Sequence, residues 1–195
     1  FVLVTKQGNE KVLFTPGTLF KASASARNKF IVWTEHKPNL RWEHADKTLL
    51  RVYNYERKKL LEYHFHSKIF APVLSPDQKT IAAVEADNRY RFFIVLINAE
   101  TGEIKHRLET PGKAYPMTPT WADDGSSLFL VLLQNNQKAL VQYFPKSEIF
   151  SNILPYQNWE ISDPVVHQNF VYFVGADNET DQLFAFDMEK KQLYK

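Results

Sequence analysis

The sequence of 195 residues contains no cysteine, so it forms no disulfide, holds no thiolate-bound metal and has no cysteine nucleophile. Glycine is also scarce: the six glycines are scattered, so no loop is glycine-rich enough to cradle a phosphate, and turns depend on Asn, Asp and Pro. The Gly-x-Ser-x-Gly turn that holds the nucleophile of many serine hydrolases is absent too. We therefore expect neither a catalytic site nor a cofactor.

Net charge and long apolar runs are equally limited. The formal net charge is +2 with both signs interspersed, which weighs against a nucleic-acid partner. No apolar run reaches the roughly 18 residues that a membrane-spanning helix needs. The chain begins at Phe1 without a signal-like segment, so we expect a processed product or a piece of a longer protein.

Short apolar runs are present, and they recur. Four passages (25–39, 75–88, 122–136 and 166–178) each show a polar turn, then four to six apolar or aromatic residues, then a polar loop. If Ile31, Ile81, Leu128 and Val171 are equivalent, the spacings are 50, 47 and 43 residues. This period indicates a repeat of one structural unit.

A second feature recurs in step with the first. The segments 51–63, 94–108, 140–153 and 183–195 each predict a strand, a tight turn and a strand. Their turns, counted from Asn54 to Asn98, Phe144 and Asp187, are 44, 46 and 43 residues apart. Two features that share one period make chance a poor explanation.

With a short apolar segment before each polar turn, every unit has four strands, which we call a, b, c and d. Four-stranded units of this length are typical of β-propeller blades. We therefore predict an all-β propeller of four-stranded antiparallel blades, a single domain over 1–195 with about four and a half blades. Its predicted parts are a half-blade at 1–18 and blades at 19–68, 69–115, 116–160 and 161–195. The alternative is an irregular β-sandwich.

The second unit resembles a known repeat. "LSPDQKTIAAV" resembles the Ser-Pro-Asp-Gly-Lys-x-Ile-Ala-Phe motif of the TolB-like (PD40, WD40-like) β-propeller family. It departs from the motif at Gln78, where the family has Gly, and at Ala83, where it has an aromatic residue. "WADDGSSLFLV" keeps the Trp, Asp and Gly but loses the Pro.

The resemblance implies a propeller that acts as a non-catalytic protein-interaction scaffold in the periplasm or cell envelope. Related repeats also form the propellers of prolyl-oligopeptidase-like serine peptidases. The alternative function is therefore a substrate-gating propeller whose catalytic domain is absent here. A propeller that binds polysaccharide or a small ligand is a third possibility, since Trp and Tyr also stack on sugars.

The start of the chain predicts an incomplete blade. Residues 1–15 have the pattern of a c–d hairpin without strands a and b. An open half-blade leaves an unpaired strand edge and bare faces, which natural proteins avoid. We expect either a fragment of a larger propeller or a small ring that closes by itself or by pairing with a second copy as a homo-oligomer.

A long b–c connection at 34–47 suggests a binding surface. Long loops on a rigid scaffold often carry recognition, and Trp and Arg are enriched at interaction hot spots. Because b–c and d–a connections lie at the same end of a propeller, residues from other blades are expected to join it. The candidate residues for binding a protein or peptide are His36, Arg41, Trp42, Glu43, His44, Arg89, Tyr90, Tyr115, Tyr156 and Trp159. Alternatively, these side chains cover neighbouring blades or plug the ring.

Two further segments carry side chains that could bind a metal ion. His64 and His66 are two apart and would project from the same face of a strand. The loop 175–182 carries oxygen ligands that could hold calcium, namely Asp177, Asn178, Glu179 and Asp181. Surface histidines and a solvated hairpin are the favoured interpretations, so no metal is predicted.

Overall fold

The computed structural model describes residues 1–19, 24–38, 47–177 and 180–195. These residues form strands and turns, together with one short 3-10 helix, η2 (Pro111–Lys113). No helix in the described part of the chain is long and apolar enough to cross a membrane.

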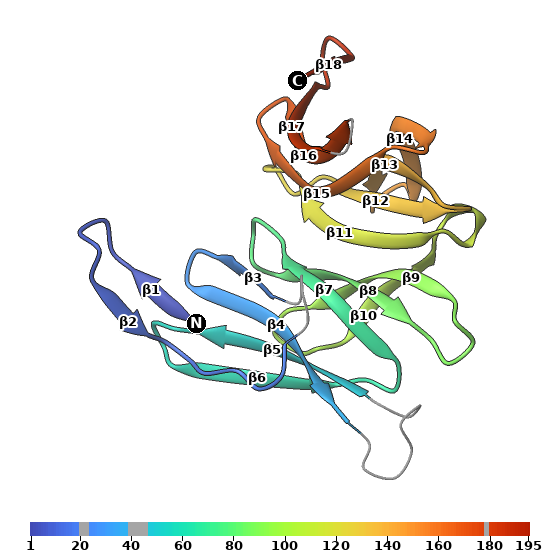
Figure 1. Cartoon of the computed structure of the whole chain (residues 1–195). Helices are drawn as coiled ribbons and strands as arrows, with labels where there is room; N and C mark the ends of the chain where they lie inside the picture. Colours follow the sequence, from blue (N-terminus) through green and yellow to red (C-terminus); the bar gives the residue numbers. More distant parts are fainter. Residues whose placement is uncertain (20–23, 39–46, 178–179) are drawn as a thin grey trace.

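Four antiparallel sheets of four strands each lie one beside the next as propeller blades (Figure 1). The first blade contains β3 (Ala24–Arg27), β4 (Phe30–Lys37), β5 (Lys47–Asn54) and β6 (Lys59–His64). The second contains β7 (Lys68–Leu74), β8 (Thr80–Ala86), β9 (Phe92–Asn98) and β10 (Ile104–Glu109). The third contains β11 (Tyr115–Trp121), β12 (Leu128–Gln134), β13 (Gln137–Phe144) and β14 (Ile149–Gln157). The fourth contains β15 (Glu160–His167), β16 (Phe170–Asp177), β17 (Thr180–Asp187) and β18 (Gln192–Tyr194).

A separate two-stranded hairpin precedes the blades, formed by β1 (Val2–Val4) and β2 (Glu10–Val12). Within every blade the strand order in space follows the order in sequence. Four four-stranded blades and an extra hairpin confirm the predicted all-β propeller of about four and a half blades.

The second strand of the middle blades is buried on both sides. All five central residues of β8, Ile81 to Glu85, are buried, as are Leu128 to Leu132 of β12. A strand packed between two blades has no solvent face, so its sequence is a continuous apolar run rather than an alternating one. The small side chains of Ala82 and Ala83, both fully buried, leave room for larger neighbours.

The innermost strands of the last three blades share a bulge before a proline. The register shifts after Phe70 in β7, after Met117 in β11 and after Ser162 in β15. In each strand the residue before the proline has a positive φ: Ala71 (48°), Thr118 (38°) and Asp163 (49°). Proline supplies no amide for the strand ladder and restricts the preceding residue, which is why pairing breaks there.

Side chains of Asp and Asn close the turns at one end of the blades. In "SPDQK" the Asp77 carboxylate accepts hydrogen bonds from Ser75 Oγ (2.6 Å) and the Lys79 amide (3.1 Å). These contacts, chiefly the one from Ser75, lower the pKa of Asp77. Gln78 takes a left-handed φ of 64° at the position where the resembling motif has Gly. Asp77 therefore caps this turn.

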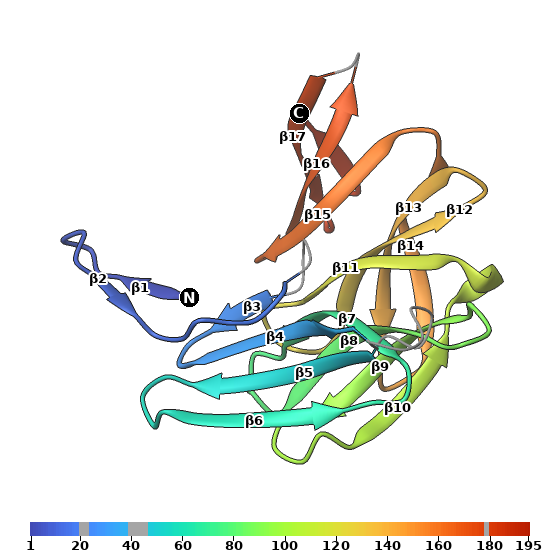
Figure 2. The ribbon, with the colours of Figure 1, turned by 60° about the horizontal axis from the view of Figure 1, so that its bottom comes forward.

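Each blade lies beside the next one along the chain (Figure 2), and apolar side chains fill the interfaces between them. One apolar cluster joins the first and second blades through residues such as Leu50 and Ile81. A second joins blades two and three, and a third joins blades three and four. The core is therefore divided among the blade interfaces, as hydrophobic burial requires in stacked repeats.

The two outer faces of this blade series differ. On the first blade, Trp33 is fully buried because Phe1 and Phe14 cover it, each with its ring centroid 5.1 Å from that of Trp33. On the fourth blade, the side facing away from the third leaves Val165 56% and Leu183 65% exposed. The N-terminal segment thus covers one end of the series, while the described residues leave the other end open.

Candidate protein-binding surface

The candidate surface lies at the end of the blades that carries the b–c and d–a connections. In the second blade this end is formed by the β8–β9 turn and by η2, which leads into β11. The turns closed by Asp77, Asn54 and Asn98 lie at the other end, because strand direction reverses at each turn. The predicted binding residues that the structure describes all come from the first of these two ends.

Tyr90 is presented at the tip of the β8–β9 turn. Its side chain is 85% exposed and its backbone has a φ of 57°. Asp87 fixes this turn, because its Oδ1 accepts hydrogen bonds from the amides of Arg89 (2.9 Å) and Arg91 (3.0 Å). The exposed ring therefore projects from a well-defined backbone, which reduces the entropy lost on binding.

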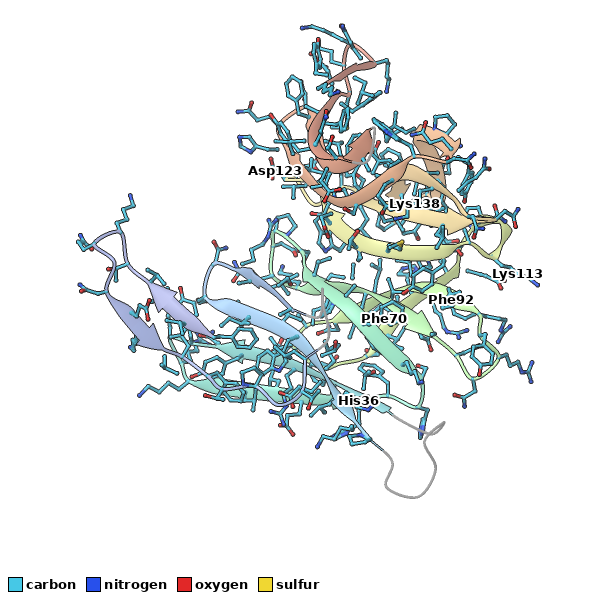
Figure 3. The ribbon with its side chains drawn as sticks, in the orientation of Figure 1. His36, Phe70, Phe92, Lys113, Asp123 and Lys138 are labelled. Carbon is cyan, nitrogen blue, oxygen red and sulfur yellow. The ribbon has the colours of Figure 1, made fainter. Side chains whose placement is uncertain are left out.

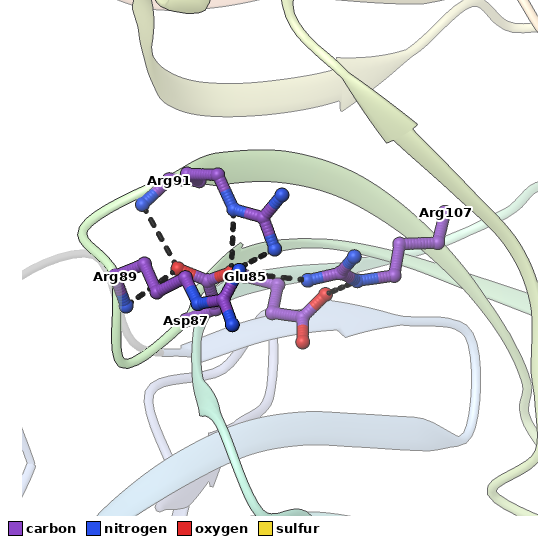
Figure 4. Close-up of polar contacts among 5 residues, drawn as sticks. All are labelled: Glu85, Asp87, Arg89, Arg91 and Arg107. Atoms are coloured by element: carbon purple, nitrogen blue, oxygen red, sulfur yellow. Dashed lines mark hydrogen bonds and ion pairs between the residues drawn. The ribbon is translucent and has the colours of Figure 1, made fainter.

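A cluster of acids and arginines lies beside the turn (Figure 4). Glu85, only 5% exposed, accepts a hydrogen bond from Arg107 Nε at 2.5 Å. The Arg107 guanidinium carbon lies 3.4 Å from the centroid of the Phe93 ring, which is a cation–π contact. A buried glutamate is stable here because it is paired with an arginine.

Asp87 links the turn to this cluster, because its Oδ2 lies 3.8 Å from Arg107 Nη2. Arg91 donates to Asp87 Oδ2 through Nε at 2.8 Å, and Arg91 Nη2 lies 2.7 Å from the same oxygen. The hydrogen bond from the Arg91 amide, together with those from its side chain and from the Arg89 amide, lowers the pKa of Asp87 to about 2. The carboxylate therefore stays charged at neutral pH, and the turn keeps its shape.

The first blade has a similar buried glutamate, Glu35, which sequence reasoning missed. Glu35 Oε1 accepts hydrogen bonds from Trp33 Nε1 (2.7 Å), the Gly17 amide (3.1 Å) and Arg51 Nη1 (3.2 Å). Glu35 and Glu85 are separated by 50 residues, the same spacing as Ile31 and Ile81. That shared spacing of an acid within an apolar strand was the available signal. The corresponding positions in the last two blades are Leu132 and Gly175, which carry no charge.

Tyr115 packs between the second and third blades rather than projecting from the surface. Its ring stacks on Phe70 (6.0 Å between centroids) and meets Phe92 edge to face (4.7 Å). Figure 3 labels both phenylalanines, which come from β7 and β9. Burial raises the pKa of Tyr115, consistent with this role in packing.

Trp159 and Tyr156 are also partly packed. Trp159 lies against Phe184 and Phe173 of its own blade, with centroid distances of 4.5 and 6.1 Å. Tyr156 packs against the cluster between the second and third blades, and burial raises its pKa. The Tyr156 hydroxyl is buried and has no hydrogen-bond partner among the described residues. Tyr115, Tyr156 and Trp159 thus pack against other residues, whereas Tyr90 is exposed at the surface.

The remaining candidates lie at the margin of this surface or outside the described residues. His36 is half-buried near the end of β4. Arg41, Trp42, Glu43 and His44 lie outside the described residues, as do Asn178 and Glu179 of the candidate calcium loop. Within the described ranges, no three His, Asp or Glu side chains are grouped as metal ligands.

Comparison with known proteins identifies the architecture. No model of a protein family matches this sequence, and no curated protein sequence matches it. A puromycin-hydrolyzing peptidase of Mycobacterium tuberculosis superimposes with a TM-score of 0.67 at 15% identity, over 97% of this chain and 30% of the peptidase. TolB from Acinetobacter baumannii superimposes with a TM-score of 0.65 at 17% identity, over 85% of this chain and 40% of TolB.

An open propeller is among the similar structures. The β-propeller domain of the Trilobed protease from Pyrococcus furiosus, which has an open velcro topology, matches with a TM-score of 0.58 and 15% identity. That match covers 85% of this chain and 56% of the domain. The chain thus spans between about a third and a little over half of these proteins. At such identities the likeness establishes a TolB-like propeller fold.

Proposed function

We propose that this chain is a non-catalytic interaction scaffold that binds a protein or peptide at the surface carrying Arg89 and Tyr90. The observation that carries the proposal is the β8–β9 turn: a tyrosine that is 85% exposed stands on a backbone fixed by Asp87. Tyrosine beside arginine is typical of interaction hot spots. The fold similarity to TolB supports a scaffold and, with it, a periplasmic or envelope location.

Affinity capture from an envelope extract of the source organism tests this function. The double variant Arg89→Ala, Tyr90→Ala is compared with the unaltered chain and with Tyr194→Ala, a matched control whose tyrosine is 38% exposed on β18. We expect a protein that is retained by the unaltered chain and the control but lost with the double variant. Because both residues are exposed, the thermal midpoint should change little. Retention that survives the double substitution would contradict the proposal.

A gating propeller of a serine peptidase is the second candidate function. It is supported by the fold similarity to the puromycin-hydrolyzing peptidase and to the Trilobed protease propeller. Labelling of the native full-length product by a fluorophosphonate probe would favour this function. A product that is not labelled, but that retains a partner through Arg89 and Tyr90, would favour the scaffold.

Self-association is a further part of the proposal. The β1–β2 hairpin exposes Val4 (58%) and Val12 (70%), and the fourth blade exposes Leu183. Such apolar strands are suited to pairing with a second copy. Sedimentation of the purified chain tests this, and a monomer at high concentration would argue against the homo-oligomer.

A further inference from the structure

A cavity of about 540 Å³ lies between the first and second blades, away from the candidate protein-binding surface. It is formed by the β5–β6 turn, the β7–β8 turn and the β9–β10 turn. These three turns belong to the opposite end of the blades from Arg89 and Tyr90. The cavity is therefore independent of the surface proposed above, and its volume is that of a site for a small molecule.

The floor of the cavity is apolar. Val52 of the first blade and Leu74 of the second are buried there, and the side chains of Phe30 and Leu61 pack on the same cluster. This floor belongs to the core between two blades and does not depend on an exposed loop. An apolar part of a ligand would be stabilised there by removal of its surface from water.

The rim is rigid because polar side chains hold its turns. Asn54 Oδ1 accepts hydrogen bonds from the amides of Glu56 (3.2 Å) and Arg57 (3.1 Å). Asn98 Oδ1 accepts hydrogen bonds from the amides of Glu100 (2.8 Å) and Thr101 (3.1 Å). A preformed rim reduces the ordering cost of binding.

Positive charge prevails around this rim. Four basic residues line the cavity: Arg57, Lys59, Lys79 and Lys105. None of them forms an ion pair with another described residue.

Among the described residues, two acids line the cavity, Asp77 and Glu100. The Asp77 carboxylate already accepts hydrogen bonds from Ser75 and from the amide of Lys79. Lys79 also interacts electrostatically with Asp77. The described lining still carries two more basic than acidic side chains, so an anion placed there would meet a favourable field.

We propose that this cavity binds a small organic acid, with its carboxylate at the basic rim and its apolar part on the floor. Arg57 suits the carboxylate, because its guanidinium can donate two parallel hydrogen bonds. Lys59 and Lys105 add charge from the first and second blades, so the ligand bridges two blades. A ligand without the carboxylate would lack the charge interaction at the rim, and a ligand without the apolar group would lack the hydrophobic contact with the floor.

Titration of the ¹⁵N-labelled chain with 4-phenylbutyrate, followed by NMR at low ionic strength, tests the proposal. We expect saturable amide shifts confined to the turns at 54–59, 75–80 and 98–105, with a Kd on the order of 1 mM for a ligand of this size. The neutral analogue 4-phenylbutanol should bind at least about tenfold more weakly, and added salt should weaken only the acid. Equal shifts from the acid and the alcohol, or shifts spread over all blades, would overturn the proposal.

Charge reversal supplies an independent comparison. Lys59→Glu with Lys105→Glu should weaken 4-phenylbutyrate by about tenfold or more, since both lysines are exposed at the rim. Lys146→Glu is the matched control, an exposed lysine in the corresponding turn of the third blade, and should leave the Kd within about twofold. An equal effect of both changes would contradict the assignment. Should the double variant fail to fold, the comparison of acid and alcohol on the unaltered chain still decides the question.

Discussion

Gly102 provides a sharp test of how the first two blades are joined. It lies in the β9–β10 turn with a φ of +74°, and a Cβ at this position would lie 2.2 Å from Tyr63 Cδ1. Tyr63 belongs to β6 of the first blade, and its hydroxyl donates a hydrogen bond to the Ala99 carbonyl of the second blade at 2.9 Å. Gly102→Ala must therefore displace a ring that bridges two blades.

The expected loss in the free energy of unfolding comes from the backbone and from Tyr63. The left-handed backbone disfavours alanine by about 1 kcal/mol. Moving Tyr63 costs about 1 kcal/mol for the hydrogen bond and about 1 kcal/mol for re-exposed ring surface. The free energy of unfolding should therefore fall by about 3 kcal/mol in Gly102→Ala.

Urea unfolding followed by fluorescence measures this difference. Gly8→Ala is the matched control, because Gly8 has a similar φ of +82° and no described atom beyond its two chain neighbours lies within 4 Å of its ideal Cβ. The control should lose only the backbone part, about 1 kcal/mol. Equal losses in the two variants would refute the contact between Gly102 and Tyr63 as the cause.

Three further predictions concern titration and packing. Burial, with a smaller effect of Glu100, raises the pKa of Tyr63 to about 12, so the folded state should lose stability as pH rises from 10 towards 12. Absorbance at 295 nm should show one late-titrating tyrosine fewer in Tyr63→Phe than in the unaltered chain. The pKa of Asp87 is lowered from 3.8 to about 2, so its contribution to stability is present above pH 3.8 and is lost as pH falls towards 2. Asp87→Asn should therefore be less stable than the unaltered chain at pH 7, and the difference in unfolding free energy should disappear near pH 2. A difference that stays constant with pH would contradict this. Removal of residues 1–16 should expose Trp33 and shift tryptophan emission to longer wavelength, whereas an unchanged spectrum would mean that Phe1 and Phe14 do not shield it.

The repeat made the fold predictable because the strands packed between blades need the same kind of sequence in each blade. Ile81 and Leu128 begin runs that are buried between blades, and such runs need apolar residues without alternation. Asp77 could be assigned to its turn because its side chain bonds to residues close in sequence. The bulges at Ala71, Thr118 and Asp163 were not foreseen, although a proline follows each of them.

The candidate surface was less predictable because its contacts join distant parts of the chain. Tyr115 and Tyr90 are both tyrosines beside polar loops, yet one packs against Phe70 of another blade and the other is exposed. The loops could be predicted from the sequence, but the residues of other blades that pack against them could not. The cavity between the blades was also invisible, because its basic rim comes from three turns that meet only in the folded chain.

Because the core is divided among the blade interfaces, the blades should differ in how readily they unfold locally. A blade packed on both sides can unfold only by breaking two interfaces, whereas the fourth blade is held by the third alone among the described residues. Local opening should therefore begin at β16 and β17 and reach β8 last. Amide exchange and proteolytic nicking would then follow a gradient along the chain, with the C-terminal strands as its labile end.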